Sequence, residues 1–281
     1  MADTTPTTGT ESEKKLNHTH KAYDNEVLAS RFEDQYQSKL DLMQFCTVDD
    51  SLEGVAGDKI VINTYTATKG TQTLKMGEGN TENIEVSFTP TEYTIELLQN
   101  RFPYYDEEEM KDPKIVEKGI DHMAVDMFNT ANGKAMAEFK KATLKAEVQK
   151  FDFDAFVDGV ALFPNNESED FNIFALVNPK DKAEIRKNLK DDLKYVEAYV
   201  RTGYIGTVNG VNLYNSNIAS QGEIILATKE AVKYIRKKGT EIEQKREPNV
   251  RLNEIFSRQY GVFAFDDATK AVKLVKKTTT A

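Results

Sequence analysis

The chain has 281 residues, with 46 acidic and 37 basic side chains, a net charge of −9, one cysteine and three histidines. This length is ample to bury a core, whereas the acidic balance argues against a general nucleic-acid-binding protein, which would carry a basic excess. The apolar runs are too short to span a membrane, and a single cysteine cannot form an internal disulfide bond, which favours a reducing compartment.

The N-terminal region divides into a polar arm and a predicted helix. Residues 1 to about 22 show no periodicity, so we expect a mobile or partner-ordered arm. We interpret His18 and His20 in this arm as solvated side chains and not as a metal site. Apolar residues then recur every three or four positions over 27–45, which predicts one amphipathic helix or two short ones. We expect Cys46 to be a small buried hydrophobic residue, with a reactive thiol as the alternative.

Residues 58–98 change to alternating polar and apolar residues, rich in β-branched and aromatic types, which predicts strands. A Thr-rich segment with three glycines, 66–80, separates them, so we expect a long hairpin reaching roughly 30 Å. An isolated two-stranded hairpin is marginally stable in water. We therefore expect it to lie on a neighbouring subunit, the alternative being a hairpin folded onto its own sheet. The intersubunit candidates here are Lys69, Gly70, Lys75, Gly77 and Gly79.

A long helix is predicted next. After an acidic break at 104–109, Asp112-Pro113 supplies an N-cap and a first-turn proline, and the apolar period runs to about Leu144. That length is near 30 residues, or roughly 45 Å, and such a helix needs a sheet or a neighbour along it. We interpret His122 within it as a surface or interface residue.

An acidic stretch follows at 151–172, with six acidic and no basic residues. Asp152, Asp154 and Asp158 partly follow a calcium-loop pattern, but Phe156 and Val157 stand where a ligand and a glycine are required, so we predict no metal site. Asp152 and Asp154 are instead candidates for an intersubunit surface, with a solvated acidic face as the alternative.

Short strands and helices fill the C-terminal half. We expect strands at 171–177, 224–227, 241–243, 254–265 and 271–275, and a helix from Asn178-Pro179 to about 188. Asn209-Gly210 is a strong signal for a type I′ hairpin turn. Thr228 is expected to cap a helix over 229–238 that ends at Gly239. This order of elements predicts an α+β fold and not a repeating β-α series.

Charge is segregated along the chain. Residues 229–251 hold eight basic and four acidic side chains. The acidic stretches 104–109 and 152–170 could face this segment within the chain or across a subunit boundary, with helix solvation as an equal alternative. The intersubunit candidates in this basic segment are Arg236, Lys245, Arg246 and Arg251.

The chain resembles the major capsid proteins of tailed bacteriophages, the HK97-type fold. The most specific stretch is 203–217, followed by 227–232, 238–243, 258–264 and 267–274, and the resemblance covers roughly residues 27–275. It implies an N-terminal arm and first helix (1–57), an extended hairpin or E-loop (58–92), a peripheral lobe with a spine helix (93–149), an axial lobe (150–225), and a return to the peripheral lobe (226–281).

The resemblance also implies a structural role. It predicts a shell of pentamers and hexamers around double-stranded DNA, located in the virion and assembled in the host cytoplasm, without cofactor or membrane. A portal protein and a separate scaffolding protein are the expected partners, because only about 25 residues precede the first helix; a trimmed chain is the other interpretation. An encapsulin-like compartment shell is the alternative function. An enzyme ranks third, because the sequence offers no nucleophile–base pair.

Two further expectations concern the hairpin. Some family members crosslink a hairpin lysine to a neighbour's asparagine, which would involve Lys69 or Lys75 and Asn249 or Asn253. That chemistry needs a carboxylate in a dry pocket, and we do not expect it. A compact chain of this length has a radius of gyration near 19 Å, too small to enclose a hairpin of roughly 30 Å, so neighbouring subunits are expected to supply the missing contacts.

Overall fold

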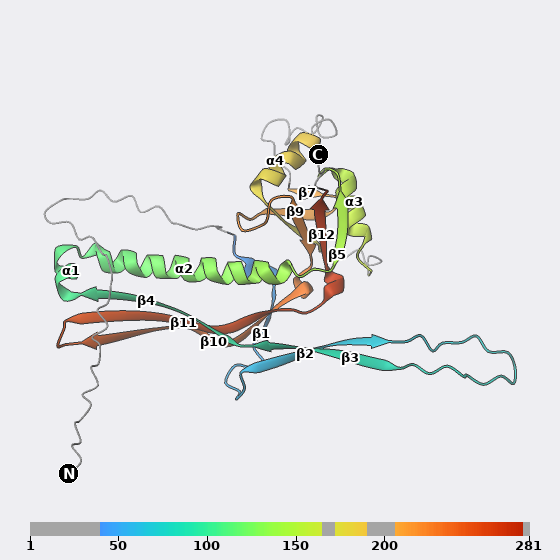
Figure 1. Ribbon diagram of the computed structural model, residues 1–281, viewed down its shortest axis with the longest axis horizontal. Helices are drawn as coiled ribbons and strands as arrows, with labels where there is room; N and C mark the ends of the chain where they lie inside the picture. The colour runs from blue at the N-terminus through green and yellow to red at the C-terminus, as the bar shows by residue number, and fades with distance from the viewer. Residues whose placement is uncertain (1–39, 165–171, 190–205, 278–281) are drawn as a thin grey trace, which may run out of the picture.

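The protein is elongated, with two sheets and a projecting hairpin (Figure 1). The computed structural model describes residues 40–164, 172–189 and 206–277. The predicted arm with His18 and His20, and most of the predicted helix over 27–45, lie outside these ranges. Where that helix enters them it is wrong: Asp41 has an extended backbone and caps only a short 3-10 turn, η1 (Leu42–Phe45).

A four-stranded sheet forms the long body. Its order is β1 (Thr47–Asp49), β10 (Val232–Glu247), β11 (Leu252–Phe265) and β4 (Glu96–Tyr105). In this sheet β1 pairs with β10 in parallel, whereas β10 with β11 and β11 with β4 are antiparallel pairs. A short helix, α1 (Asp106–Lys111), follows β4 at one end of this sheet.

The predicted long helix is α2 (Lys114–Phe139), which runs along the four-stranded sheet (Figure 1). The helix begins one residue later than predicted, with Pro113 at its N-cap, and the Asp112 carboxylate still accepts a hydrogen bond from the Lys114 N–H at 3.1 Å. Gly119 lets the helix approach the sheet, since a Cβ there would lie 2.3 Å from the Phe102 ring. The helix ends at Phe139, five residues before the predicted end at Leu144, because Leu144 is instead the first residue of a strand.

A second, six-stranded sheet forms the upper lobe in Figure 1. Its order is β5 (Leu144–Val148), β12 (Ala271–Lys276), β9 (Glu223–Ala227), β6 (Phe174–Val177), β8 (Val211–Asn215) and β7 (Thr207–Val208). The helices α3 (Phe153–Ala161) and α4 (Pro179–Asn188) accompany it. Two of its strands, β5 and β12, come from outside the 150–225 range expected for one lobe.

Local signals in this lobe were predictive. The Asn178 side chain caps α4 by accepting from the Lys180 N–H at 3.0 Å. Asn209 and Gly210 have φ of 48° and 75°, which is the left-handed pair that a type I′ turn requires. The lobe's apolar core is continuous across α3, α4 and the sheet.

The predicted helix over 229–238 is wrong. Residues Lys229–Ala231 form a 3-10 turn, η2, and Val232 begins the 16-residue strand β10. Its first residues pair with β1 on one side and β11 on the other. Paired on both edges, with Val232, Tyr234 and Ile235 buried, the segment is stabilised as a strand despite its helix-forming Lys, Glu and Ala residues. Gly239, the expected helix end, lies instead at an irregularity in the β10–β11 register.

A third short turn, η3 (Ala268–Lys270), precedes β12. Among the described residues, no helix is both long and apolar enough to cross a membrane. In the same part of the chain, no cluster of His, Cys, Asp or Glu side chains is arranged to hold a metal ion.

Candidate assembly surface

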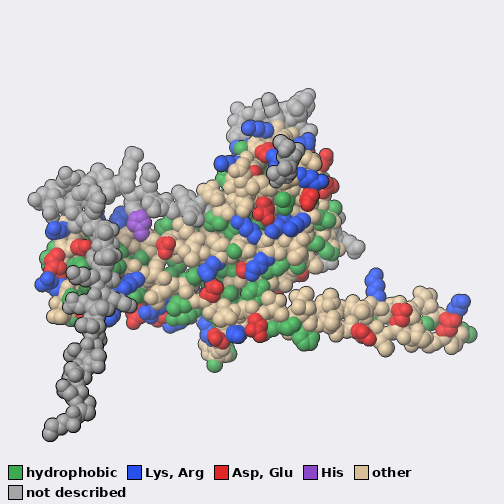
Figure 2. All heavy atoms as spheres, in the orientation of Figure 1, with side chains coloured by type: hydrophobic (Ala, Val, Ile, Leu, Met, Phe, Trp, Pro, Cys, Tyr) green, Lys and Arg blue, Asp and Glu red, His purple; other side chains and the backbone are tan. Residues whose placement is uncertain are grey.

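The projecting hairpin consists of β2 (Lys59–Ala67) and β3 (Val86–Thr94), which among the described strands pair only with each other. Their register runs from Lys59 opposite Thr94 to Ala67 opposite Val86. Nine residues at about 3.3 Å span roughly 30 Å, and the tip, 68–85, extends further. In Figure 2 the hairpin stands clear of the body, so its strands are open to solvent. The predicted extended hairpin is confirmed, and it does not fold back onto its own sheet.

The two faces of this hairpin differ in chemistry. Directly paired residues share a face, and the register therefore places Tyr65 beside Phe88 and Ala67 beside Val86 on one side. The rings of Tyr65 and Phe88 lie 6.1 Å apart, and the two residues are 65% and 61% exposed. We call this side the apolar face; its apolar members are Val61, Tyr65, Ala67, Val86, Phe88 and Pro90, and Asn63 and Glu92 lie among them on the half nearer the root.

The opposite side of the outer hairpin is polar. It carries Thr64 opposite Thr89 and Thr66 opposite Ser87, and the last two hydroxyls are 3.1 Å apart. The outer half of the hairpin, with one exposed apolar side and one hydroxyl side, has no core of its own; nearer the root, the hydroxyl side also carries Ile60 and Ile62. The apolar face is therefore exposed in the monomer, which makes it a candidate contact surface.

The predicted tip residues lie in an ordered but solvent-exposed loop. The Asn80 amide donates to the Gly70 carbonyl at 3.1 Å, and the Thr81 N–H donates to Gln72 at 3.2 Å. Gly70 is buried against the returning chain, where a Cβ would lie 2.7 Å from Ile84 Cγ1. Gly77 has φ of 89° and forms the turn.

The other tip candidates, Lys69, Lys75 and Gly79, are exposed. Within the described chain, neither Lys69 nor Lys75 forms an ion pair, so both amines are available to another molecule. The tip residues therefore lie together at the outer end of the hairpin, as the sequence predicts, but no structural contact assigns them to an interface.

The root of the hairpin is fastened to the four-stranded sheet. The Tyr93 hydroxyl donates to the Phe265 carbonyl and accepts from the Phe265 N–H, both at 3.2 Å. Just before β2, the carbonyl of Val55 and, at 2.8 Å, that of Gly57 accept hydrogen bonds from the amine of Lys237, which lies in β10. The hairpin's direction is thus fixed at two separate points of the body.

The basic segment faces acidic residues of its own chain. Arg246 pairs with Asp106 at 2.8 Å and Arg251 with Glu107 at 2.6 Å, which realises the intrachain alternative for the acidic stretch 104–109. Arg236 holds Asp50 through two hydrogen bonds of 2.9 Å. Lys245 is exposed and forms no ion pair within the described residues.

The acidic candidates of the upper lobe have local roles. Asp152 caps α3 by accepting from the Ala155 N–H at 3.1 Å, and it pairs with Lys150 at 2.9 Å. Burial opposes ionisation of this carboxyl, but the bonds from Lys150 and Ala155 outweigh burial and lower its pKa. Asp154 is exposed in the first turn of α3. Residues 165–171 of the same stretch lie outside the described residues.

One proposed crosslink acceptor is engaged within the chain. Asn253 is 5% exposed, and its amide donates to Asp106 at 2.6 Å. Asn249 is exposed in the turn between β10 and β11. This turn lies at the end of the body opposite the hairpin (Figure 1).

Comparison with known proteins shows which proteins the whole chain resembles. No protein-family model matches the chain. The major capsid protein of Staphylococcus phage phiMR11 is 25% identical over 261 residues, covering 89% of this chain and 92% of that protein. The capsid structure of Cyanophage P-SCSP1u has a TM-score of 0.70 at 14% identity, covering 99% of this chain and 100% of that one.

The mature capsid of bacteriophage PhiM1 also has a TM-score of 0.70, at 10% identity, covering 100% of this chain and 98% of that one. These structural likenesses over the whole chain establish the HK97-type α+β fold that the sequence predicts.

Proposed function

We infer that this chain is the major capsid protein of a tailed bacteriophage and that its copies build the shell of the virion. The observation that carries this function is the exposed apolar face of the hairpin, which has no partner within the described chain. An encapsulin-like compartment is not favoured, because the curated relative aligned over most of this chain is named a phage major capsid protein. The role is structural.

The hairpin supplies adhesion between subunits. Covering an aromatic side chain contributes about 1.5–3 kcal/mol, and the apolar face offers two rings and four other apolar side chains. When this face lies on a neighbour, each subunit is held by a copy beside it and holds another. In a closed symmetric shell, such repeated overlap leaves no apolar face uncovered.

Finer features of assembly follow as proposals. The six-stranded lobe would meet its copies at the five-fold and six-fold centres, giving pentamers and hexamers, and the four-stranded body would form the three-fold contacts. Assembly takes place in the host cytoplasm with a separate scaffolding protein and a portal protein. The net charge of −9 would keep packaged DNA from adhering to the shell, without sequence-specific contact.

Deleting the tip tests the overlap. A chain lacking residues 68–80 should fold, because these residues contribute no side chain to the three core clusters, but should not form stable shells. Thermal unfolding reports the fold, and electron microscopy with size-exclusion chromatography reports assembly. The matched control shortens a different exposed turn by replacing 248–250 with two glycines. Normal particles from the tip deletion would overturn the overlap.

A further inference from the structure

A groove on the four-stranded sheet is left open beside α2. This helix packs mainly on β4 and β11, and contacts β10 little. A helix is about 10 Å across and strands are about 4.8 Å apart, so one helix covers about two strands. The face of β10 on the helix side is therefore bare, and Ile242, which lines the groove, is 68% exposed.

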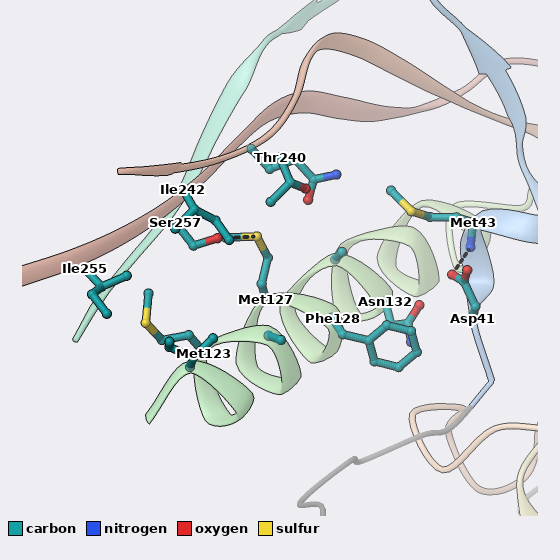
Figure 3. A pocket seen from close by; sticks show the side chains of 14 residues that line it. Asp41, Met43, Met123, Met127, Phe128, Asn132, Thr240, Ile242, Ile255 and Ser257 are labelled. Carbon is teal, nitrogen blue, oxygen red and sulfur yellow. Dashed lines mark hydrogen bonds between the residues drawn. The ribbon is translucent and has the colours of Figure 1, made fainter. Parts of the chain in front are cut away.

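The groove is apolar and large enough to accept apolar side chains. It has a volume of about 320 Å³ and is lined from α2 by Ile120, Met123, Met127 and Phe128, with Ile242 and Ile255 facing them from the sheet (Figure 3). Thr240 and Ile242 of β10 line it. Beyond Ile235 one edge of β10 is unpaired, because β1 pairs only with Lys233 to Ile235 and no other described strand pairs with that edge. Methionine side chains adapt readily to an incoming apolar surface.

The described chain begins at the end of this groove. Asp41, Met43 and Asn132 line that end (Figure 3). The Asn132 amide donates to the Leu40 carbonyl at 2.9 Å and accepts from the Leu42 N–H at 3.0 Å. Asn132, in the C-terminal half of α2, thus fixes the backbone at Leu40, to which residue 39 is joined.

We propose that residues 27–39 of the same chain dock in this groove as an amphipathic helix beside α2. Their apolar residues Val27, Leu28, Phe32 and Tyr36 recur at helical spacing. Thirteen helical residues span about 20 Å, and the groove follows α2 from Ile120 to Asn132, which is about 18 Å at 1.5 Å per residue. The covalent link at Leu40 gives this segment a high effective concentration over the groove.

Protease access tests the docking in unassembled protein. In the full chain, replacing Ile242→Glu should speed tryptic cleavage after Arg31 by roughly tenfold or more, because the docked state is lost. Ile84→Glu is the matched control, since Ile84 is similarly exposed, at 62% against 68% for Ile242, but lies in the hairpin. Equal cleavage of the wild type and both variants would overturn the proposal.

A cysteine pair supplies a second, independent measurement. Phe32→Cys with Ile242→Cys should form a disulfide within one chain under mild oxidation, whereas Phe32→Cys with Phe88→Cys should not. Native Cys46 is buried and does not interfere. Disulfides only between chains, or protection of Arg31 only in assembled particles, would assign the groove to a second copy and overturn intrachain docking. The expected results, slow cleavage of the wild type and an intrachain disulfide, are both read in unassembled protein, so they stand even if assembly through the hairpin is disproved.

Discussion

Replacing the two rings of the apolar face, Tyr65→Thr with Phe88→Thr, should raise the concentration needed for assembly without unfolding the monomer. Threonine keeps the β-branched character that suits a strand. Since both positions are more than half exposed, the monomer's free energy of unfolding should change by less than about 1 kcal/mol.

The size of the assembly effect follows from the exposed ring area. Aromatic side chains present roughly 200 Å² each, of which Tyr65 and Phe88 expose 65% and 61%. Covering about 250 Å² at about 25 cal/mol per Å² contributes about 6 kcal/mol. Threonine retains some of this and coverage is incomplete, so we expect a loss of about 3 kcal/mol per contact, or roughly a hundredfold in association constant.

Light scattering against protein concentration measures the assembly threshold, and circular dichroism checks the monomer. The matched control is Thr64→Ala with Thr89→Ala, which alters the adjacent pair on the polar side. A double ring variant that assembles at the wild-type threshold would refute the assignment of the apolar face to a neighbour.

Three further predictions concern the body and the upper lobe. Asn253→Ala should lower the free energy of unfolding by about 1–3 kcal/mol, since it breaks a buried hydrogen bond to Asp106. Arg246→Ala removes an exposed side chain and should lower it by less than about 1 kcal/mol. Urea denaturation measures both variants, and equal losses of stability would contradict this ranking. Burial raises the pKa of the Cys46 thiol to about 12, so a thiol reagent at pH 8 should label it only after unfolding, and prompt labelling of the folded chain would argue against the buried site. Burial also raises the pKa of Asp181, which accepts from the Gly222 N–H at 2.8 Å. A carboxyl with a raised folded pKa binds its proton more tightly when folded, so the wild type should gain stability as pH falls through that pKa toward the unfolded value near 4, and Asp181→Asn should lack this gain. The free energy of unfolding is measured for both chains from pH 7 to pH 4. If it changes by the same amount with pH in the wild type and in Asp181→Asn, the prediction is refuted.

Sequence signals that act over a few residues predicted the structure well. The Asn209-Gly210 turn and the Asn178 cap depend on backbone geometry that those residues favour locally, and both are present. The long helix was predictable because its apolar period persists over many turns. Its end was not, since β5 pairs with β12, which lies about 125 residues later in the chain.

The strand β10 shows where local signals fail. Its Lys, Glu and Arg residues favour a helix when read in isolation. Pairing on both edges decides the outcome, and a single sequence does not reveal those partners. The apolar face was missed for a related reason: the polar tip dominated the composition, and only the register reveals that Tyr65 and Phe88 lie side by side.

The fastening of the hairpin root determines how the protein bears force. The chain passes from β3 through Ile95 directly into β4, which pairs with β11 over ten registered positions. Tension on the hairpin therefore pulls β4 lengthwise against its neighbour, so that the ladder resists in shear and its bonds are loaded together. A strand peeled from its end would lose those hydrogen bonds one after another, at far lower force. The shear geometry therefore lets the hairpin carry tension between subunits of a shell that is under internal pressure.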